Sequence, residues 1–183
     1  MTNSVFKVVA IGPESTGKST LCKQLGLHFN ANVVEEYARA FLNKNGTNYT
    51  YNNLLTIAQG QVAAEEKAHL NLKTNLLIAD TDMYVMKVWC EYVFGKCHYF
   101  ILNNLAANNA NLYLLMHPNI PWVKDNLREY PNEKIRWELF YYYKDIVVNS
   151  GINFIEINST NYHERFLTAK TAIVNLITPN TKR

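Results

Sequence analysis

A strand, a glycine-containing loop and a helix follow one another near the N-terminus, and this order constrains the fold more than any other feature of the chain. The residues from Val5 to Ile11 form a nearly continuous apolar run rich in β-branched side chains, which predicts a strand covered on both faces of a parallel sheet. The next segment, Gly12–Ser19, reads GPESTGKS and matches the phosphate-binding pattern G-x-x-x-x-G-K-[ST]. Apolar residues then recur at helical spacing and predict a helix over 18–29. The alternative is a tight turn that merely contains Gly and Lys, but every fixed position and both flanking elements fit a phosphate-binding loop.

The spacing of this loop has a chemical reason. Glycines let successive backbone N–H groups point inward around the β-phosphate of a nucleotide, and the helix N-terminus adds positive dipole character. Lys18 can reach the β and γ oxygens, and Ser19 offers its hydroxyl to Mg²⁺. We therefore expect the nucleotide to be bound by the following residues of the loop and of the first helical turn: Gly12, Glu14, Ser15, Thr16, Gly17, Lys18, Ser19 and Thr20.

Short apolar runs alternate with long helical patterns along the rest of the chain. Further strands are expected at 32–35, 76–80, 112–116 and 153–157, and helices at 51–72, 83–94, 133–148 and 161–177. This alternation predicts an α/β fold of three layers, a P-loop NTPase fold with a parallel five-stranded sheet and helices on both faces.

Smaller signals refine this expectation. Asn161 and Glu164 predict a capping box at the start of the last helix. The asparagine pairs at 52–53, 103–104 and 108–109 are interpreted as turns. The Pro-containing segment 118–131 predicts a mobile loop, which makes the region of about 118–136 a short lid. Residues 1–183 are expected to form a single domain.

Composition excludes several classes of protein. The 183 residues carry 18 Lys and Arg against 15 Asp and Glu, a net charge of +3 that is spread along the chain and gives no nucleic-acid footprint. No signal peptide is recognisable, and no apolar run approaches the about 18 residues that span a membrane. The 3 cysteines form no CxxC pair, which favours a reduced, cytoplasmic compartment over a disulfide or zinc scaffold. The oligomeric state stays open.

A second metal anchor is expected at the end of the apolar run 76–80. Asp80 closes this run in the manner of a Walker B strand, so Ser19 and Asp80 are predicted to hold Mg²⁺. Asp82 follows at the carboxyl edge of the sheet, where ligands bind in open α/β folds. It is interpreted either as a ligand of substrate hydroxyls or as the cap of the helix that begins near Met83.

The nucleotide is expected to be ATP. The base-reading motif N-K-x-D of GTPases is missing, because Asn43 and Lys44 are followed by Asn45 and Gly46. Mechanical ATPases usually need further domains, so a small-molecule kinase fits the length better. Such a kinase needs an acceptor carboxylate, for which Glu36 is the candidate, and cations over the transferred phosphoryl group. Arginines that could supply these cations stand beside Glu36 and around the Pro-containing loop: Arg39, Arg128 and Arg136.

Several segments together resemble the ribosylnicotinamide kinase domain of the bacterial NadR type, a family of P-loop small-molecule kinases. The shared segments, in the order of the family, are GPESTGKST at 12–20, EYAR at 36–39, DTD at 80–82, Tyr92 with Gly95 and Lys96, Pro121 and Trp122 with Asp125 and Arg128, and IEI at 155–157. The resemblance covers nearly the whole chain. It implies a fold like that of nucleoside and nucleotide kinases, and phosphorylation of nicotinamide riboside by ATP at the ribose 5′-hydroxyl.

The resemblance also implies roles for single residues. Glu36 would orient the acceptor hydroxyl, Asp82 would hold ribose hydroxyls, and Arg128 would close over the γ-phosphate. Residues for the acceptor ring and its surroundings are Tyr37, Arg39, Trp89 and Tyr92, of which the aromatic ones can stack on a cationic pyridinium. Core packing is the alternative for Tyr37, Trp89 and Tyr92, and it fits Trp89 and Tyr92 at least as well as stacking does. A surface ion pair is the alternative for Arg39.

The chain departs from the family in two places. Relatives resemble fusions with an N-terminal adenylyltransferase domain, but only four residues precede the first predicted strand and no H-x-G-H motif is present, so we expect onward conversion to NAD elsewhere. In the lid, Asn126 stands where a glycine is expected and Lys124 replaces an acidic residue.

The rival functions are a kinase for another nucleoside or small polyol, and a regulatory ATPase without an acceptor.

Overall fold

Helices and strands alternate through most of the chain in a computed structural model that describes residues 5–107 and 109–178. The elements in order are β1 (Phe6–Ile11), α1 (Lys18–Phe29), β2 (Asn32–Val34), α2 (Tyr37–Asn45), α3 (Tyr51–Leu70), β3 (Leu76–Asp80), α4 (Met83–Phe94), α5 (Tyr99–Ala106), β4 (Leu112–Met116), α6 (Glu133–Asn149), β5 (Phe154–Ile157) and α7 (Tyr162–Ile177).

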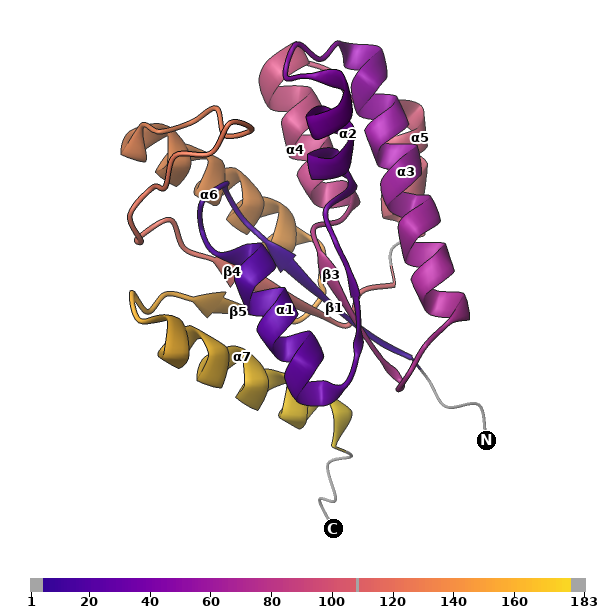
Figure 1. Cartoon of the computed structure of the whole chain (residues 1–183), viewed down its shortest axis with the longest axis vertical. Coiled ribbons are helices and arrows are strands. Elements are labelled where there is room, and N and C mark those ends of the chain that lie inside the picture. The colour runs from indigo at the N-terminus through magenta and orange to yellow at the C-terminus, as the bar shows by residue number, and fades with distance from the viewer. Residues whose placement is uncertain (1–4, 108, 179–183) are drawn as a thin grey trace.

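The five strands form one parallel sheet in the order β2-β3-β1-β4-β5 (Figure 1). β1 lies in the centre, where Val8 is in register with Ile78 of β3 on one side and with Leu112 of β4 on the other. The predicted sheet is confirmed, and the observed strand bounds lie within one residue of the expected ones. Because the chain leaves β1 between two parallel neighbours, the loop after β1 opens into the crevice where α/β sheets bind ligands.

Alternate residues of β1 serve the two faces of the sheet. Val8 and Ala10 pack with the side of α1 and α7, whereas Val9 and Ile11 pack with the side of α4 and α6. All four side chains are fully buried, which explains why β1 is a continuous apolar run rather than an alternating one. The three-layer arrangement that the sequence predicts is therefore confirmed.

A third cluster of buried residues lies among the helices alone. It joins α2, α3, α4 and α5 through side chains such as Ile57, Met86 and Ile101. Figure 1 shows these four helices grouped at one end of the molecule, beyond the carboxyl end of β3. Of these four helices, α2 and α4 line the space above the loop that follows β1.

Two of these four helices are absent from the sequence prediction. α2 has only 9 residues and α5 only 8, and few of their side chains are buried, so their apolar periodicity is weak. The interpretation of the asparagine pairs as turns is wrong at 52–53, inside α3, and at 103–104, inside α5. Asn53 instead closes a capping box with Thr50. Of the pair at 108–109, residue 108 lies outside the described residues.

The remaining boundaries agree closely with expectation. α1 and α4 have the predicted bounds, α3 ends two residues early, and α6 ends one residue late. The expected capping box of α7 is only half formed. Asn161 accepts from the N–H groups of His163 and Glu164, but the Glu164 carboxylate accepts from the Ser159 hydroxyl at 2.5 Å. The predicted loop between β4 and α6 is free of helix and strand, and no helix of the described residues could span a membrane.

Candidate active site

The loop between β1 and α1 needs glycine at two positions. Gly12 has φ +140°, and a Cβ there would lie 2.7 Å from the Met116 carbonyl oxygen of β4. Gly17 has φ +81°, and a Cβ there would lie 3.2 Å from the Tyr162 ring. Both values lie in the region that L side chains rarely adopt, so the two glycines allow the loop to pass close to its neighbours. These are the fixed glycines of the motif.

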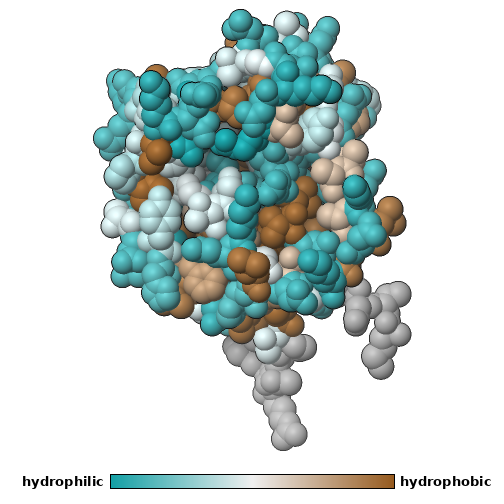
Figure 2. All heavy atoms as spheres, in the orientation of Figure 1, coloured by the Kyte–Doolittle hydropathy of each residue, from teal (hydrophilic) through white to brown (hydrophobic). Residues whose placement is uncertain are grey.

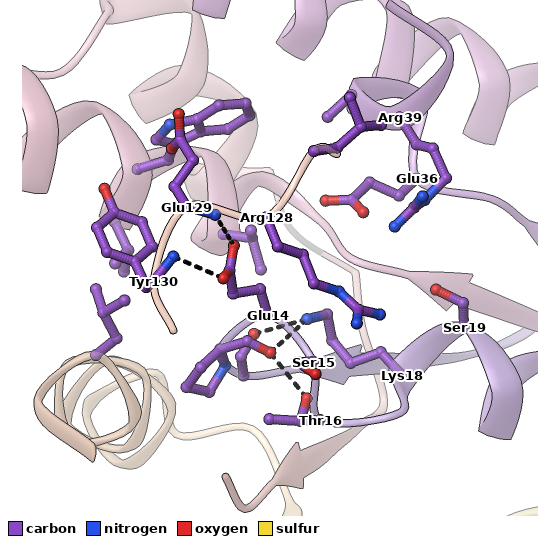
Figure 3. A pocket seen from close by; sticks show the side chains of 18 of the residues that line it. Glu14, Ser15, Thr16, Lys18, Ser19, Glu36, Arg39, Arg128, Glu129 and Tyr130 are labelled. Atoms are coloured by element: carbon purple, nitrogen blue, oxygen red, sulfur yellow. Dashed lines mark hydrogen bonds between the residues drawn. The ribbon is translucent and has the colours of Figure 1, made fainter. Parts of the chain in front are cut away.

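Lys18 and Thr16 bond to the carbonyls at the start of the loop. The Lys18 ammonium donates to the carbonyl oxygens of Gly12 at 2.9 Å and of Pro13 at 2.8 Å. The Thr16 hydroxyl donates to the same Pro13 oxygen at 2.8 Å. Figure 3 shows the Lys18 side chain lying across the loop. The positive charge is thereby held at the place where the motif requires it to meet phosphate oxygens.

Arg165 supports the loop from behind and was not found by sequence reasoning. Its side chain is 1% exposed and donates to the Thr16 carbonyl oxygen at 2.7 Å and to the Asn119 side-chain oxygen at 2.6 Å. It also donates to the carbonyls of His117 and Ser159. Burial lowers the pKa of the guanidinium. One residue thus ties the phosphate loop to the segments after β4 and β5. The available signal was its position on the buried stripe of α7, four residues before Ala169.

A cavity lies above the loop (Figure 3), and in the orientation of Figure 1 the surface is hollowed with hydrophilic residues around the recess (Figure 2). Most of the predicted site residues line this cavity: Gly12, Glu14, Ser15, Thr16, Gly17, Lys18, Ser19, Thr20, Glu36, Arg39, Trp89, Tyr92 and Arg128. Sequence reasoning missed several lining residues that come from α2, α4, α6 and the lid: Ala38, Leu42, Val85, Val88, Leu127, Glu129, Tyr130, Leu139 and Tyr143.

Glu36 connects β2 to α2 and lies partly buried in the cavity wall (Figure 3). Its position is fixed by the next residue, because the Tyr37 backbone N–H donates to the Gln61 side-chain oxygen of α3 at 2.8 Å. Burial raises the pKa of the Glu36 carboxyl above its ordinary value. The nearby Lys18 ammonium opposes this rise and Asp80 adds to it. A carboxyl group that faces a cavity and has a raised pKa is suited to accept a proton.

Asp80 ends β3 on the strand next to β1, where it pairs in register with Ala10. It is 3% exposed, and its Oδ1 atom has no hydrogen-bond partner among the described residues. Ser19 lines the cavity at the start of α1. A buried carboxylate oxygen without a partner and a hydroxyl are oxygen donors of the kind that Mg²⁺ prefers. The residues present therefore fit a magnesium ion.

Asp82 lies elsewhere than the substrate role predicts. It caps α4 by accepting from the Tyr84 N–H at 2.9 Å, and it also accepts from the Tyr113 hydroxyl at 2.6 Å. It lines a second cavity, together with Lys7 and Glu65, and not the cavity above the phosphate loop. The geometry matches the helix-cap alternative. Burial raises the pKa of this carboxyl as well, against the opposing charge of Lys7.

Two further predicted residues point away from the cavity. The Tyr37 ring packs against Gly60 of α3, where an added Cβ would lie 2.2 Å from the ring. Arg136, predicted to bind nucleotide, is 4% exposed and donates to the Ile120 carbonyl oxygen at 3.3 Å. It lies on the inward stripe of α6 with Leu139, Phe140 and Tyr143. A contact with α3 thus sets the direction of Tyr37, and a hydrogen bond to the loop after β4 sets that of Arg136.

Trp89 and Tyr92 face the cavity and also pack against neighbouring side chains. Both line the cavity from α4. Trp89 also donates its indole N–H to the Tyr49 hydroxyl at 2.9 Å, and the two ring centroids are 4.9 Å apart. Tyr92 lies edge-on to Tyr130 of the lid with ring centroids 5.7 Å apart. The rings therefore form part of the cavity wall and hold it to neighbouring elements.

The lid contacts both sides of the cavity. Towards the phosphate loop, the Glu14 carboxylate accepts hydrogen bonds from the lid, and Arg128 extends from the lid toward Lys18 (Figure 3). Towards the helices, Arg39 forms an ion pair of 3.0 Å with Asp125, and Glu129 accepts from the Tyr49 hydroxyl at 2.8 Å. Burial raises the pKa of Glu129, and the charge of Glu14 adds to the rise. Residues 127–130 of this segment thus form part of the cavity wall.

Comparisons with known proteins agree with this architecture. The chain is 28% identical over 167 residues to the trifunctional NAD biosynthesis/regulator protein NadR of Escherichia coli K12, and the match covers 89% of the chain and 40% of that protein. The chain thus spans less than half the length of this relative.

Among solved structures, the chain matches NadR protein in complex with NR, with a TM-score of 0.79 and 20% identity over 98% of this chain and 52% of that one. It also matches NadR protein in complex with NAD and AMP-PNP, with a TM-score of 0.72 and 20% identity over 94% of this chain and 49% of that one. A thymidylate kinase from Ehrlichia chaffeensis matches with a TM-score of 0.63 and 15% identity over 93% of this chain and 99% of that one.

These structural matches confirm the fold of P-loop kinases. A family model described as an AAA domain, AAA_28, matches residues 7–165, which is most of the chain. The chain therefore belongs to the AAA_28 family of AAA domains.

Proposed function

We propose that the protein transfers the γ-phosphoryl group of ATP to the ribose 5′-hydroxyl of nicotinamide riboside and so forms nicotinamide mononucleotide. The observation that carries this proposal is the single cavity that joins a phosphate-binding loop, an acceptor-type carboxyl and aromatic walls under one lid. A nucleotide-binding protein without an acceptor would have no use for the second and third of these.

The phosphate end of the cavity contains the positive charges that phosphoryl transfer requires. Lys18 lies across the loop, and Arg128 extends toward it from the lid (Figure 3). Together they stabilise negative charge on the equatorial oxygens of the transferred group. Ser19 and Asp80 would hold Mg²⁺, which when bound neutralises charge on the β- and γ-phosphates. The lid excludes water from this end and suppresses hydrolysis of ATP.

Glu36 is the proposed proton acceptor. The acceptor oxygen forms a bond to the γ-phosphorus, the bond from that phosphorus to the β–γ bridging oxygen breaks, and ADP leaves. The hydroxyl proton passes to the Glu36 carboxylate. Because burial raises the pKa of Glu36, its carboxylate binds this proton more readily than an exposed one.

The acceptor end favours a cationic aromatic ring. Trp89, Tyr92 and Tyr130 supply aromatic faces, and Glu36 and Glu129 supply carboxyl groups around the same space. An aromatic face attracts a cation by roughly 0.5 to 2 kcal/mol, depending on desolvation. The pyridinium of nicotinamide riboside is such a cation, and NadR, whose fold this chain shares, has been solved in complex with NR.

The test is product formation by the purified protein with Mg²⁺ and ATP. Parallel reactions contain nicotinamide riboside, adenosine, uridine, thymidine, ribitol or no acceptor, and the products are separated by chromatography. We expect nicotinamide mononucleotide and ADP in equal amounts with nicotinamide riboside, and little ADP without an acceptor. Turnover with another nucleoside or with the polyol alone would reassign the acceptor, and acceptor-independent ADP formation would favour a regulatory ATPase.

A further inference from the structure

Glu14 places a negative charge in a loop that binds phosphate, yet its carboxylate is turned to the lid. One carboxylate oxygen accepts from the Tyr130 backbone N–H at 2.7 Å and from the Trp122 indole N–H at 3.1 Å. The other accepts from the Glu129 backbone N–H at 2.9 Å. Hydrogen bonds to a charged acceptor are about twice as strong as neutral ones. The lid donors thus stabilise a charge that would otherwise repel the nucleotide.

The neighbouring residue anchors the other end of the same lid segment. The Ser15 hydroxyl oxygen accepts from the Val123 backbone N–H at 2.9 Å. Consecutive residues of the phosphate loop therefore hold positions 122–123 and 129–130 of the lid. Figure 3 shows Glu14 and Ser15 side by side in the phosphate loop, with Glu129 and Tyr130 bonded to Glu14.

Between these anchors the chain folds into a turn that carries Arg128. Asp125 accepts from the Leu127 N–H through its side chain at 3.0 Å and from the Arg128 N–H through its carbonyl at 3.2 Å. The Arg128 guanidinium donates to the Val123 carbonyl oxygen. The backbone around Arg128 is therefore fixed on both sides, and its side chain crosses from the lid into the cavity (Figure 3).

We propose that Glu14 is a positioning residue, which acts through Arg128 by holding the backbone of residues 129–130 against the phosphate loop. The inference rests on the proposed function, because it assigns Arg128 to the transferred phosphoryl group. Displacement of such a group by about 1 Å can cost about 100-fold in rate. A contact from Glu14 to the nucleotide is a different role, since it would act without Arg128.

The test uses Glu14→Gln, which leaves a single acceptor oxygen for the lid N–H groups. We expect kcat for phosphorylation to fall by about 10- to 100-fold, while the Kd for AMP-PNP changes by no more than about twofold. Glu138→Gln removes the same charge from an exposed position of α6 and is the matched control. Arg128→Ala and the double variant complete a cycle. If Glu14 acts through Arg128, the double variant turns over about as fast as Arg128→Ala alone.

A second readout does not depend on activity. Hydrogen exchange of the backbone amides at 129 and 130, in protein without nucleotide, is expected to speed up in Glu14→Gln and to stay unchanged in Glu138→Gln. Trp122→Phe removes one donor without altering the loop and should give a smaller change in the same direction, which keeps the test available if Glu14→Gln fails to fold.

The positioning role would be overturned by unchanged amide exchange in Glu14→Gln. It would also be overturned if the fold-losses in kcat of Glu14→Gln and Arg128→Ala multiply in the double variant. A wild-type protein that makes no nicotinamide mononucleotide contradicts the proposed function instead, whatever the exchange shows. The two failures are therefore distinguishable.

Discussion

Glu36 is partly buried and Asp82 is buried, burial raises the pKa of both carboxyl groups, and their surroundings separate them. Asp82 is bonded to the Tyr84 N–H and the Tyr113 hydroxyl, so its oxygens are occupied in a structural role. Glu36 faces the cavity that also contains Lys18. Burial raises the pKa in both cases, and Glu36 is the proposed proton acceptor because it lines the cavity.

Replacement of Glu36 by Gln should lower kcat by about 100- to 10,000-fold, because the acceptor hydroxyl loses its proton acceptor. The KM for ATP should change little, since Glu36 belongs to the acceptor end. Steady-state kinetics with nicotinamide riboside measures both. Glu35→Gln is the matched control, because Glu35 is exposed and pairs with Lys23 at 3.1 Å. Near-normal turnover of Glu36→Gln would remove Glu36 from this role.

The same substitution should stabilise the protein at neutral pH. The folded-state pKa of Glu36 lies above its unfolded value, so its contribution to stability is fully present below the unfolded pKa and is lost as the pH rises through the folded pKa. Gln cannot ionise and avoids this loss. Thermal unfolding at pH 4 and pH 8 should show a gain for Glu36→Gln at pH 8 and a smaller gain at pH 4. An equal shift at both pH values would contradict the pKa direction.

The sequence predicted the place of residues that are fixed by the backbone of a motif. It did not predict the place of residues for which this depends on the direction of their side chains. The phosphate loop lines the cavity as predicted, because its motif specifies strand, turn and helix together. Tyr37 and Arg136 were predicted in the site, but Tyr37 packs against Gly60 of α3 and Arg136 donates to the Ile120 carbonyl oxygen of the loop after β4. Arg165 went unnoticed, since a single arginine in an amphipathic helix is usually exposed.

At the scale of elements, the long helices and the strands were predictable and the short helices were not. The missing prediction of α2 matters most for the site, because α2 carries Arg39 and begins directly after Glu36. Its 9 residues bury only Ala38 and Leu42, so its amphipathic pattern is short, and its place is fixed by contacts with α3 that no local pattern reveals. The position of Glu36 thus depends on the packing of α2 against α3.

Gly60→Ala tests this dependence. Alanine in place of glycine normally stabilises a helix by about 1 kcal/mol. Here the new Cβ would lie 2.2 Å from the Tyr37 ring, so we expect a loss of stability and a lower kcat as the start of α2 shifts. In a Tyr37→Ala background, which lacks the clash, Gly60→Ala should instead raise stability relative to Tyr37→Ala alone. Thermal unfolding and kinetics of the single and double variants measure these effects. A stabilised, fully active Gly60→Ala protein would show that Glu36 is positioned independently of this contact.

At the scale of the whole molecule, the strand order brings the parts of the site together. The five apolar runs predicted the strands, because strands buried on both faces are continuously apolar. The order β2-β3-β1-β4-β5 then places the loop after β1 beside Asp80 at the end of β3, while β2 leads to Glu36. The phosphate loop, the proposed metal ligand and the proposed proton acceptor therefore follow three neighbouring strands, and the segment between β4 and α6 contacts the phosphate loop and lines the same cavity.

If this arrangement binds nucleotide and Mg²⁺ as proposed, the stability of the whole molecule should depend on both. At a free AMP-PNP concentration of about 100 times its Kd, the free energy of unfolding should rise by about 2.7 kcal/mol. Chelation of Mg²⁺ with EDTA at the same AMP-PNP concentration should remove part of this gain. Asp80→Asn in the presence of Mg²⁺ should behave like the wild type in EDTA, because the unpartnered Asp80 oxygen is the proposed metal ligand. Asp145→Asn, at an exposed position of α6, should keep the full Mg²⁺-dependent gain. If Asp80→Asn also keeps it, Mg²⁺ is held by other groups, and the carboxylate at the end of β3 has a structural role instead.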